Sequence, residues 1–273
     1  MSYSFEPGRV YRMPTHFGPT PGPRQQPDGF ARDWKHSPQT LTVSASFLTE
    51  AARLDQHMPE GFALIGEPVV TVDFHYMTGI DWLAGRGYNM IFASWPAAFK
   101  GRQDKATGKF LSEIWENLAD PIIAGRDEIG HPKLYAEIPE PRFWDGAQIC
   151  SAGWMGFRFL DLSVSELRDT AASPTKAHSD GTMMLKYVPR TGTRGEADVN
   201  QVTITPTEDP ETSVERRQTG IGAVRFHRAT PSDLPTMHHV INALADFPVI
   251  EQRGGSLTHS RGSKWSRDQR VLV

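Results

Sequence analysis

The sequence predicts a mainly antiparallel β protein, with a barrel- or cone-like sheet and a few flanking helices. Runs of β-branched and aromatic residues, which favour strands, recur along most of the chain. Glycine and proline interrupt these runs at short intervals, and no long helical segment separates them. Parallel β-α-β crossovers need such helices, so hairpin pairing in a closed, curved sheet is the favoured arrangement.

The expected elements follow from residue type and spacing. A helix is expected after residue 47, with Thr49 as its N-cap, because apolar residues recur there at helical spacing up to residue 58. A second amphipathic helix is expected between residues 234 and 246, and residues 206–219 are expected to form a solvated turn. The expected strands are residues 40–47, 69–77, 88–95, 148–152, 157–164, 182–188, 199–205 and 220–226.

The two ends of the chain differ from the middle. Residues 6–38 are rich in proline and glycine, which leaves little room for helix or sheet. They are either a disordered leader or an extended arm (about 1–38) that aromatic residues pin onto this chain or a neighbouring subunit. The stretch from Arg253 onward is basic, and a surface strand or subunit contact is favoured there over a nucleic-acid tail. We expect a single domain over residues 1–273.

Composition excludes several classes of function. The chain has 273 residues, 22% of them charged, and a formal net charge of −3, which disfavours an electrostatic nucleic-acid binder. One cysteine, Cys150, excludes an internal disulfide and suits a reducing compartment. No signal peptide or membrane span is visible, so a cytoplasmic protein is expected. His238 and His239 do not face each other on a helix, so no metal site is expected.

The chain is organised around a stretch that runs from Asp120 to Tyr135. Asp120 is suited to cap a short helix, and Pro121 is suited to its first position. Gly130 is the natural stop, and Pro132 prevents the helix from continuing. From Lys133 the sequence alternates, so that Lys133, Tyr135 and Glu137 share a face that must meet water or line a cavity.

This stretch resembles the acetoacetate decarboxylase family. In that family a helix with a Gly-Arg-Glu motif is followed, after a short turn, by Pro-Lys, and the lysine forms a Schiff base with the substrate. Gly125, Arg126, Asp127, Pro132 and Lys133 stand in this pattern. The resemblance runs over most of the chain, with further matches at Met13-Pro14, Phe17-Gly18-Pro19, Met155-Gly156 and Met184-Leu185-Lys186-Tyr187-Val188-Pro189.

The chain departs from the family pattern at three places. The family has a second lysine directly after the nucleophile, where this chain has Leu134. The family also has an arginine before the first strand and a glutamate in the loop after the second. Residues 36–40 do not contain this arginine. Residues 83–87 do not contain this glutamate, and Arg86 stands in that loop instead. Asp73 lies about where the family has another strand carboxylate, on the same strand face as His75.

The resemblance makes Lys133 the candidate nucleophile. An ordinary lysine has a pKa of about 10.4 and is charged at neutral pH, whereas an attacking amine must be neutral. Burial or a nearby cation lowers the pKa of a lysine, and the resemblance implies this kind of activation. Because the second lysine is missing, we expect burial to contribute more here, helped by Arg126 or His131.

The function expected from the resemblance is that of a cofactor-free lyase that forms a Schiff base with a small oxo acid. Lys133 condenses with the keto group, and the iminium accepts the electrons left when CO2 departs from a β-keto acid. Asp73 is the candidate general acid–base, and Tyr135 and Glu137 are candidates for proton transfer. Arg126 and His131 are candidate substrate-binding residues.

Two other functions remain open at this point. The same iminium could serve an aldolase-dehydratase that condenses pyruvate with an aldehyde, with Arg86 holding a substrate carboxylate that is retained. A non-catalytic small-molecule-binding β barrel would need Lys133 only for structure. In each case we expect a small oxo acid or similar molecule as partner, a homo-oligomer, and neither nucleic acid nor membrane.

Overall fold

The computed structural model describes residues 4–32, 34, 36–170, 179–206, 212–263 and 269–273. The helical elements are few and short, and they comprise η1 Thr15–Phe17, α1 Ala51–Asp55, η2 Asp81–Leu83, α2 Ala119–Ala124, the π-helical turn η3 Gly125–Ile129 and α3 His238–Ala245. The strands are β1 Gln39–Leu48, β2 Phe62–Leu64, β3 Val69–Ile80, β4 Arg86–Lys100, β5 Lys105–Glu116, β6 Lys133–Tyr135, β7 Arg142–Trp144, β8 Ala147–Trp154, β9 Phe157–Asp169, β10 Gly181–Pro189, β11 Ala197–Pro206, β12 Ser213–Phe226, β13 Glu251–Arg261 and β14 Arg270–Leu272.

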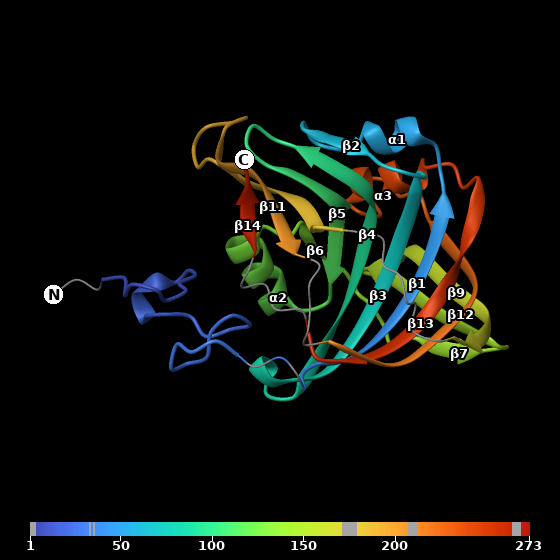
Figure 1. Cartoon of the computed structure of the whole chain (residues 1–273), viewed down its shortest axis with the longest axis horizontal. Helices are drawn as coiled ribbons and strands as arrows, with labels where there is room; N and C mark the ends of the chain where they lie inside the picture. The colour runs from blue at the N-terminus through green and yellow to red at the C-terminus, as the bar shows by residue number, and fades with distance from the viewer. Residues whose placement is uncertain (1–3, 33, 35, 171–178, 207–211, 264–268) are drawn as a thin grey trace.

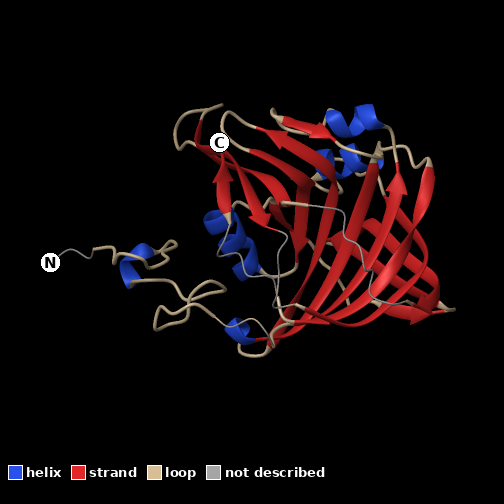
Figure 2. Cartoon of the chain, viewed as in Figure 1, coloured by secondary structure: helices blue, strands red, loops and turns tan. Residues whose placement is uncertain are grey.

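All the described strands belong to one strongly curved sheet, with the helices at its margins (Figures 1 and 2). The strand order is β14-β11-β10-β5-β4-β3-β1-β13-β12-β9-β8-β7, while β2 pairs with β4 and β6 pairs with β5. Pairing is antiparallel except between β10 and β5 and between β5 and β6. The mainly antiparallel, cone-like fold is therefore confirmed, but the sheet does not close, because β14 and β7 do not pair with each other.

The predicted strands are all present, and several are longer than predicted. The helix predicted after residue 47 is short, because Phe47 lies in β1 and Glu50 rather than Thr49 occupies the N-cap. The solvated turn predicted at residues 206–219 is wrong from Ser213 onward, where β12 pairs with β13. Residues 207–211, Lys264 and Arg267 lie outside the described residues. Within the described ranges, no helix is long and apolar enough to cross a membrane.

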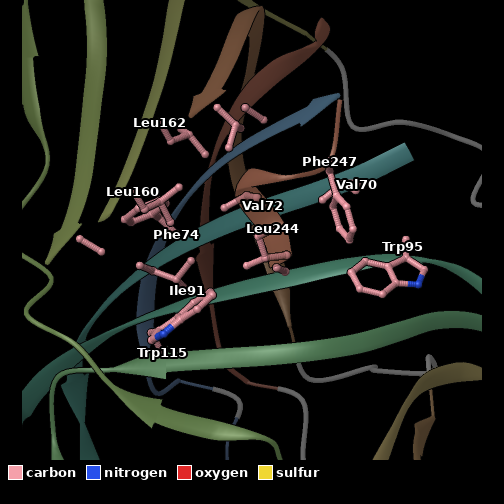
Figure 3. Packing of buried hydrophobic residues seen from close by; sticks show 14 of the residues in the cluster. Val70, Val72, Phe74, Ile91, Trp95, Trp115, Leu160, Leu162, Leu244 and Phe247 are labelled. Carbon is pink, nitrogen blue, oxygen red and sulfur yellow. The ribbon is translucent and has the colours of Figure 1, made fainter. Parts of the chain in front are cut away.

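The main hydrophobic core lies on one face of the central strands. Inward-facing residues of β1, β3 and β4 pack against β8, β9 and α3 (Figure 3). Its largest fully buried side chains include Trp95, Trp115 and Phe74. Burial of this much apolar surface is the principal stabilising contribution to a fold of this size.

The opposite face of β3, β4 and β5 carries a second set of apolar side chains. Successive residues of a strand point to opposite sides, so Met90 and Phe92 face away from their core-facing neighbour Ile91. In register, Met90 lies opposite Glu116 and Phe92 lies opposite Ile114. This face, with β10, β11 and α2, forms the walls of the cavity described below.

Glu113 is a carboxyl group inside the main core. It lies opposite Ala93 in the β4–β5 register and is only 5% exposed. Burial raises the pKa of Glu113 to about 8, and a hydrogen bond with Ser112 opposes this rise. The folded protein therefore holds this proton more tightly than the unfolded chain does.

We expect Glu113 to make stability fall as the pH rises. Its folded pKa is raised, so its contribution is fully present below 4.5, the usual pKa, and is lost as the pH approaches about 8. Glu113→Gln should remove this loss, which is at most about 5 kcal/mol. Urea unfolding at pH 5 and pH 8.5 measures it, with the exposed Glu60→Gln as control. If the free energy of unfolding of Glu113→Gln differed between pH 5 and pH 8.5 as much as that of the native protein, Glu113 would not be the source of the pH dependence.

Candidate active site

Lys133 is buried at the start of β6, beside the last residues of β5. It lies opposite Ile114 in the parallel β5–β6 pair and is 7% exposed. Its Nζ lies 2.7 Å from Oε1 of Glu116, which is fully buried, and donates a hydrogen bond of 2.9 Å to the carbonyl oxygen of Pro121. The amine is thus held between a carboxylate and a helix carbonyl.

The helix before Lys133 determines where its side chain lies. α2 begins at Ala119, so Asp120 lies inside the first turn and makes no capping hydrogen bond, which corrects the predicted cap. Gly130 ends η3 with a φ of 78°, the left-handed conformation that favours glycine, as predicted. The chain then turns back, and the Lys133 side chain passes under Gly125, where a Cβ atom would lie 2.5 Å from its Cε.

We expect Gly125→Ala to displace the Lys133 side chain. The added methyl group would overlap Lys133 Cε and Nζ, so the amine must move away from Glu116 or the helix must shift. Overpacking of this kind costs about 1–3 kcal/mol. Peptide-mapped labelling of Lys133 with an amine reagent should increase, and the melting temperature should fall. Ile123→Ala, a change at a half-exposed residue of the same helix, is the control. Unchanged labelling and stability in Gly125→Ala would contradict the close approach.

A second cation reaches this site from the N-terminal arm. In Figure 1 the arm extends on the side of α2 and β14. Arg24 donates a hydrogen bond of 2.9 Å from Nη2 to the carbonyl oxygen of Ala124 and forms an ion pair with Glu128 of η3. Arg12 pairs with the same carboxylate. Two guanidinium groups thus share one carboxylate, and the charges of Asp127 and Asp120 also act on Arg12.

The arm has an internal structure that presents Arg24. The side chain of Gln25 accepts a hydrogen bond from the Val10 amide and donates to the carbonyl oxygens of Val10 and Thr20. These bonds join two parts of the arm that are far apart in its sequence. The contacts of the described arm with α2 and η3 come from Arg12 and Arg24. Pinning by aromatic residues is wrong for Phe17 and Phe30, which are exposed, whereas Trp34 is buried.

The environment lowers the pKa of Lys133 below its usual value. Burial is the largest cause, the ion pair with Glu116 opposes it, and the positive charge of Arg24 lowers it further. Arg24 thus provides a cationic influence where Leu134 replaces the second lysine of the family pattern. Burial also raises the pKa of Glu116, against the opposing effect of Lys133. Both shifts favour transfer of the proton from the amine to the carboxylate.

His131 does not act as the helping cation proposed from the sequence. Burial lowers its pKa well below the usual value, and the positive charges of Lys133 and Arg24 lower it further. The ring is therefore neutral at physiological pH. It lines the same cavity as Lys133.

Lys133 opens into a cavity of about 270 Å³. Its wall includes the charged or ionisable groups Arg24, Glu116 and His131, and the phenol of Tyr88. Burial and the charge of Glu116 raise the pKa of Tyr88 well above its usual value, so the phenol remains a hydrogen-bond donor. The larger apolar side chains of the wall are Trp34, Met77, Ile80, Trp82, Met90, Phe92, Leu111 and Ile129.

Among the predicted site residues, the structure brings Lys133 and His131 to this cavity, and Arg126 lies next to it. Nη1 of Arg126 donates a hydrogen bond of 2.8 Å to the carbonyl oxygen of Lys133, so Arg126 braces the lysine backbone. Tyr135 is 48% exposed, and Glu137 is an exposed acceptor for the Met155 amide. Neither lines the cavity; Tyr135 is the last residue of β6, and Glu137 lies beyond the end of that strand.

Asp73 and Arg86 also lie outside the cavity wall. Asp73 shares the cavity-side face of β3 with His75, as predicted, but it accepts a hydrogen bond from Ser44 of β1. Arg86 is exposed, and its guanidinium donates to the carbonyl oxygen of Leu83 at 3.2 Å. Arg86 therefore does not hold a carboxylate in this cavity, and among the described residues Arg24 is the arginine of the cavity wall.

Sequence reasoning missed Glu116, Arg24 and Tyr88. A signal existed for Glu116, since a carboxylate at the end of the apolar run from Phe110 to Trp115 has no obvious solvated position. Arg24 gave no such signal, because contacts of a proline-rich arm depend on the folded surface beneath it. Tyr88 was included in a strand but not as a site residue.

By its fold and site, the protein is a curved, mainly antiparallel β protein with a cavity built around a buried lysine and its paired carboxylate. Within this class, the chain belongs to the acetoacetate decarboxylase family, whose family model matches residues 12–261. No curated protein matches the chain significantly.

Several solved structures share the fold of this chain. An acetoacetate decarboxylase from Legionella pneumophila is 18% identical with a TM-score of 0.65, and the match covers 93% of this chain and 92% of that one. The enduracididine biosynthesis enzyme MppR, complexed with pyruvate, is 17% identical with a TM-score of 0.64, over 93% and 99% of the two chains. An acetoacetate decarboxylase-like enzyme from Sphingomonas wittichii RW1 is 16% identical with a TM-score of 0.63, over 89% and 94%.

Proposed function

We propose that this protein is a lyase that forms a Schiff base between Lys133 and the keto group of an oxo acid. The observation that supports this most strongly is the buried Lys133–Glu116 pair, 2.7 Å apart, in the wall of a cavity. A structural lysine would gain little from a site that lowers its pKa. A nucleophilic amine requires that shift, because only its neutral form attacks a carbonyl carbon.

Glu116 is the proton-transfer group in the formation of the Schiff base. It accepts the ammonium proton of Lys133, and the neutral amine adds to the keto carbon. The alkoxide formed takes one proton from the attacking nitrogen, and the same carboxyl group returns its proton to the resulting hydroxyl, so that water leaves and an iminium forms. A group at hydrogen-bond distance with a raised pKa is suited to both transfers.

Decarboxylation of a β-keto acid is the first reaction that the iminium supports. The bond to the carboxylate breaks, CO2 leaves, and the electron pair moves to the iminium nitrogen to give an enamine. The enamine carbon then takes a proton, for which Tyr88 and Glu116 are the candidate donors in the cavity wall. Addition of water releases the ketone and regenerates Lys133.

Aldol condensation followed by loss of water is the second candidate, and Arg24 favours it. A guanidinium binds carboxylate strongly, and gripping a carboxylate that must leave as CO2 would stabilise the ground state. Arg24 therefore suits an oxo acid that retains this carboxylate, such as pyruvate or a diacid that loses only its other carboxylate. The similar structure of MppR was also solved with the condensation product of pyruvate and imidazole 4-carboxaldehyde.

Two assays on the same preparation separate these reactions. CO2 release is measured with acetoacetate and with a β-keto diacid, and loss of pyruvate is measured with an added aldehyde. CO2 release from a monoacid supports plain decarboxylation, whereas pyruvate loss with a new conjugated product supports condensation. If neither CO2 release nor pyruvate loss is detected and no lysine adduct forms, the protein is better explained as a non-catalytic binding protein.

A further inference from the structure

The cavity extends well beyond the polar groups that surround Lys133. Lys133 lies on β6, and from there the wall of the cavity continues across β5, β4 and β3 to η2. Neighbouring strands are about 4.8 Å apart, so the wall from β5 to β3 alone spans roughly 10 Å. A four-carbon oxo acid bound at Lys133 would fill only the β5–β6 end of this space.

The described wall of the far part of the cavity is mainly apolar, with the phenol of Tyr88 opposite Met77 in the β3–β4 register. Met77 of β3 and Ile80 at its end lie beside Trp82 of η2, and Trp34 contributes from the arm side. The charged side chains of the described wall are confined to Arg24, Glu116 and Lys133, which come from the arm, β5 and β6. The wall is thus divided into a charged end at the lysine and an apolar end with two indole rings.

We infer that the substrate is an oxo acid with an aryl or bulky alkyl group, which occupies the apolar end while its keto group meets Lys133. This inference rests on the proposed Schiff-base function and names the substrate class. Aromatic side chains such as Trp34 and Trp82 bind planar apolar groups through large buried contact areas. A carboxylate on the same substrate remains at the charged end, near Arg24.

Benzoylacetate and acetoacetate provide the test, because both are β-keto acids. They differ only in the group on the keto carbon, which is phenyl in benzoylacetate and methyl in acetoacetate. The amount of borohydride-trapped adduct is measured against the concentration of each acid. The half-saturating concentration of benzoylacetate should be at least about tenfold lower, since apolar pocket contacts discriminate by such factors. Equal values, or tighter binding of acetoacetate, would overturn the inference while leaving the Schiff-base function intact.

Filling the apolar end should remove this preference. Met77→Trp places a larger side chain there and should bring the ratio of the two half-saturating concentrations close to one. Met155→Trp, at a residue 77% exposed in the β8–β9 turn, should keep the ratio of the native protein. If Met77→Trp does not fold, Trp82→Ala replaces it, with the same expected loss of preference.

Binding of ligands that have no keto group separates this inference from the proposed function. Calorimetry compares 3-phenylpropionate with butyrate, neither of which can form a Schiff base. At least tenfold tighter binding of 3-phenylpropionate supports the apolar site even if no adduct forms with any oxo acid. Equal affinity of the two carboxylates would overturn it.

Discussion

Lys133→Met is expected to lower kcat by a factor on the order of 10⁴ or more, because Lys133 is the one amine among the described residues of the cavity wall. Methionine has a similar length and is apolar, so the site keeps its packing. Glu116 loses its cationic partner, and its already raised pKa then favours the protonated form, which avoids a buried unpaired charge. Turnover should be measured near pH 6, where that protonation stabilises the fold.

Lys186→Met is the matched control for this change. The Nζ of Lys186 donates to the carbonyl oxygen of Asp127 at 2.6 Å, so it also contacts η3, but it does not line the cavity with Lys133. We expect Lys186→Met to retain turnover within a small factor. Equal losses in both variants would mean that the helix, rather than the amine of Lys133, is responsible for the effect.

Arg24→Met is expected to have the second largest effect, on both the pH profile and substrate binding. The pKa of Arg24 is lowered to about 10, by burial and then by Arg12, so the group is still charged at neutral pH. Its positive charge lowers the pKa of Lys133, and its removal therefore raises that pKa. The neutral amine then forms at higher pH, and the rising limb of activity should move in the alkaline direction.

The half-saturating concentration of the oxo acid should also rise at least about tenfold in Arg24→Met, since a buried guanidinium–carboxylate contact is lost. Arg86→Met is the matched control, because Arg86 is exposed and lies outside the cavity wall. Steady-state kinetics from pH 5 to pH 9 measure both effects. A raised half-saturating concentration in Arg86→Met and an unchanged one in Arg24→Met would restore the carboxylate-binding role that the sequence suggested for Arg86.

The local features of this fold could be predicted because they depend on neighbouring residues. Strand positions follow from β-branched runs, and the stop at Gly130 follows from its freedom to adopt a positive φ. The position of Lys133 shortly after this stop could be predicted for the same reason, because it depends on neighbouring residues. The open sheet could not be predicted, because closure depends on whether β14 and β7 meet, and strand patterns contain no information on that.

The site could be predicted only in part because its contacts join distant parts of the chain. Alternation placed Tyr135 and Glu137 on the face of Lys133, but β6 has three residues and neither side chain lines the cavity. Arg24 reaches the site from the arm, more than one hundred residues before Lys133. The need for glycine at position 125 likewise arises from the Lys133 side chain, which the turn at Gly130 brings beneath the helix.

The central claim is that Lys133 forms a Schiff base with an oxo acid. Incubation with acetoacetate, pyruvate or benzoylacetate, followed by borohydride and peptide mapping by mass spectrometry, tests it most directly. We predict the mass of one reduced ligand on Lys133, more adduct at pH 8 than at pH 5, and none on this peptide in Lys133→Met. Adducts confined to other lysines, or equal labelling of Lys133→Met, would contradict the claim.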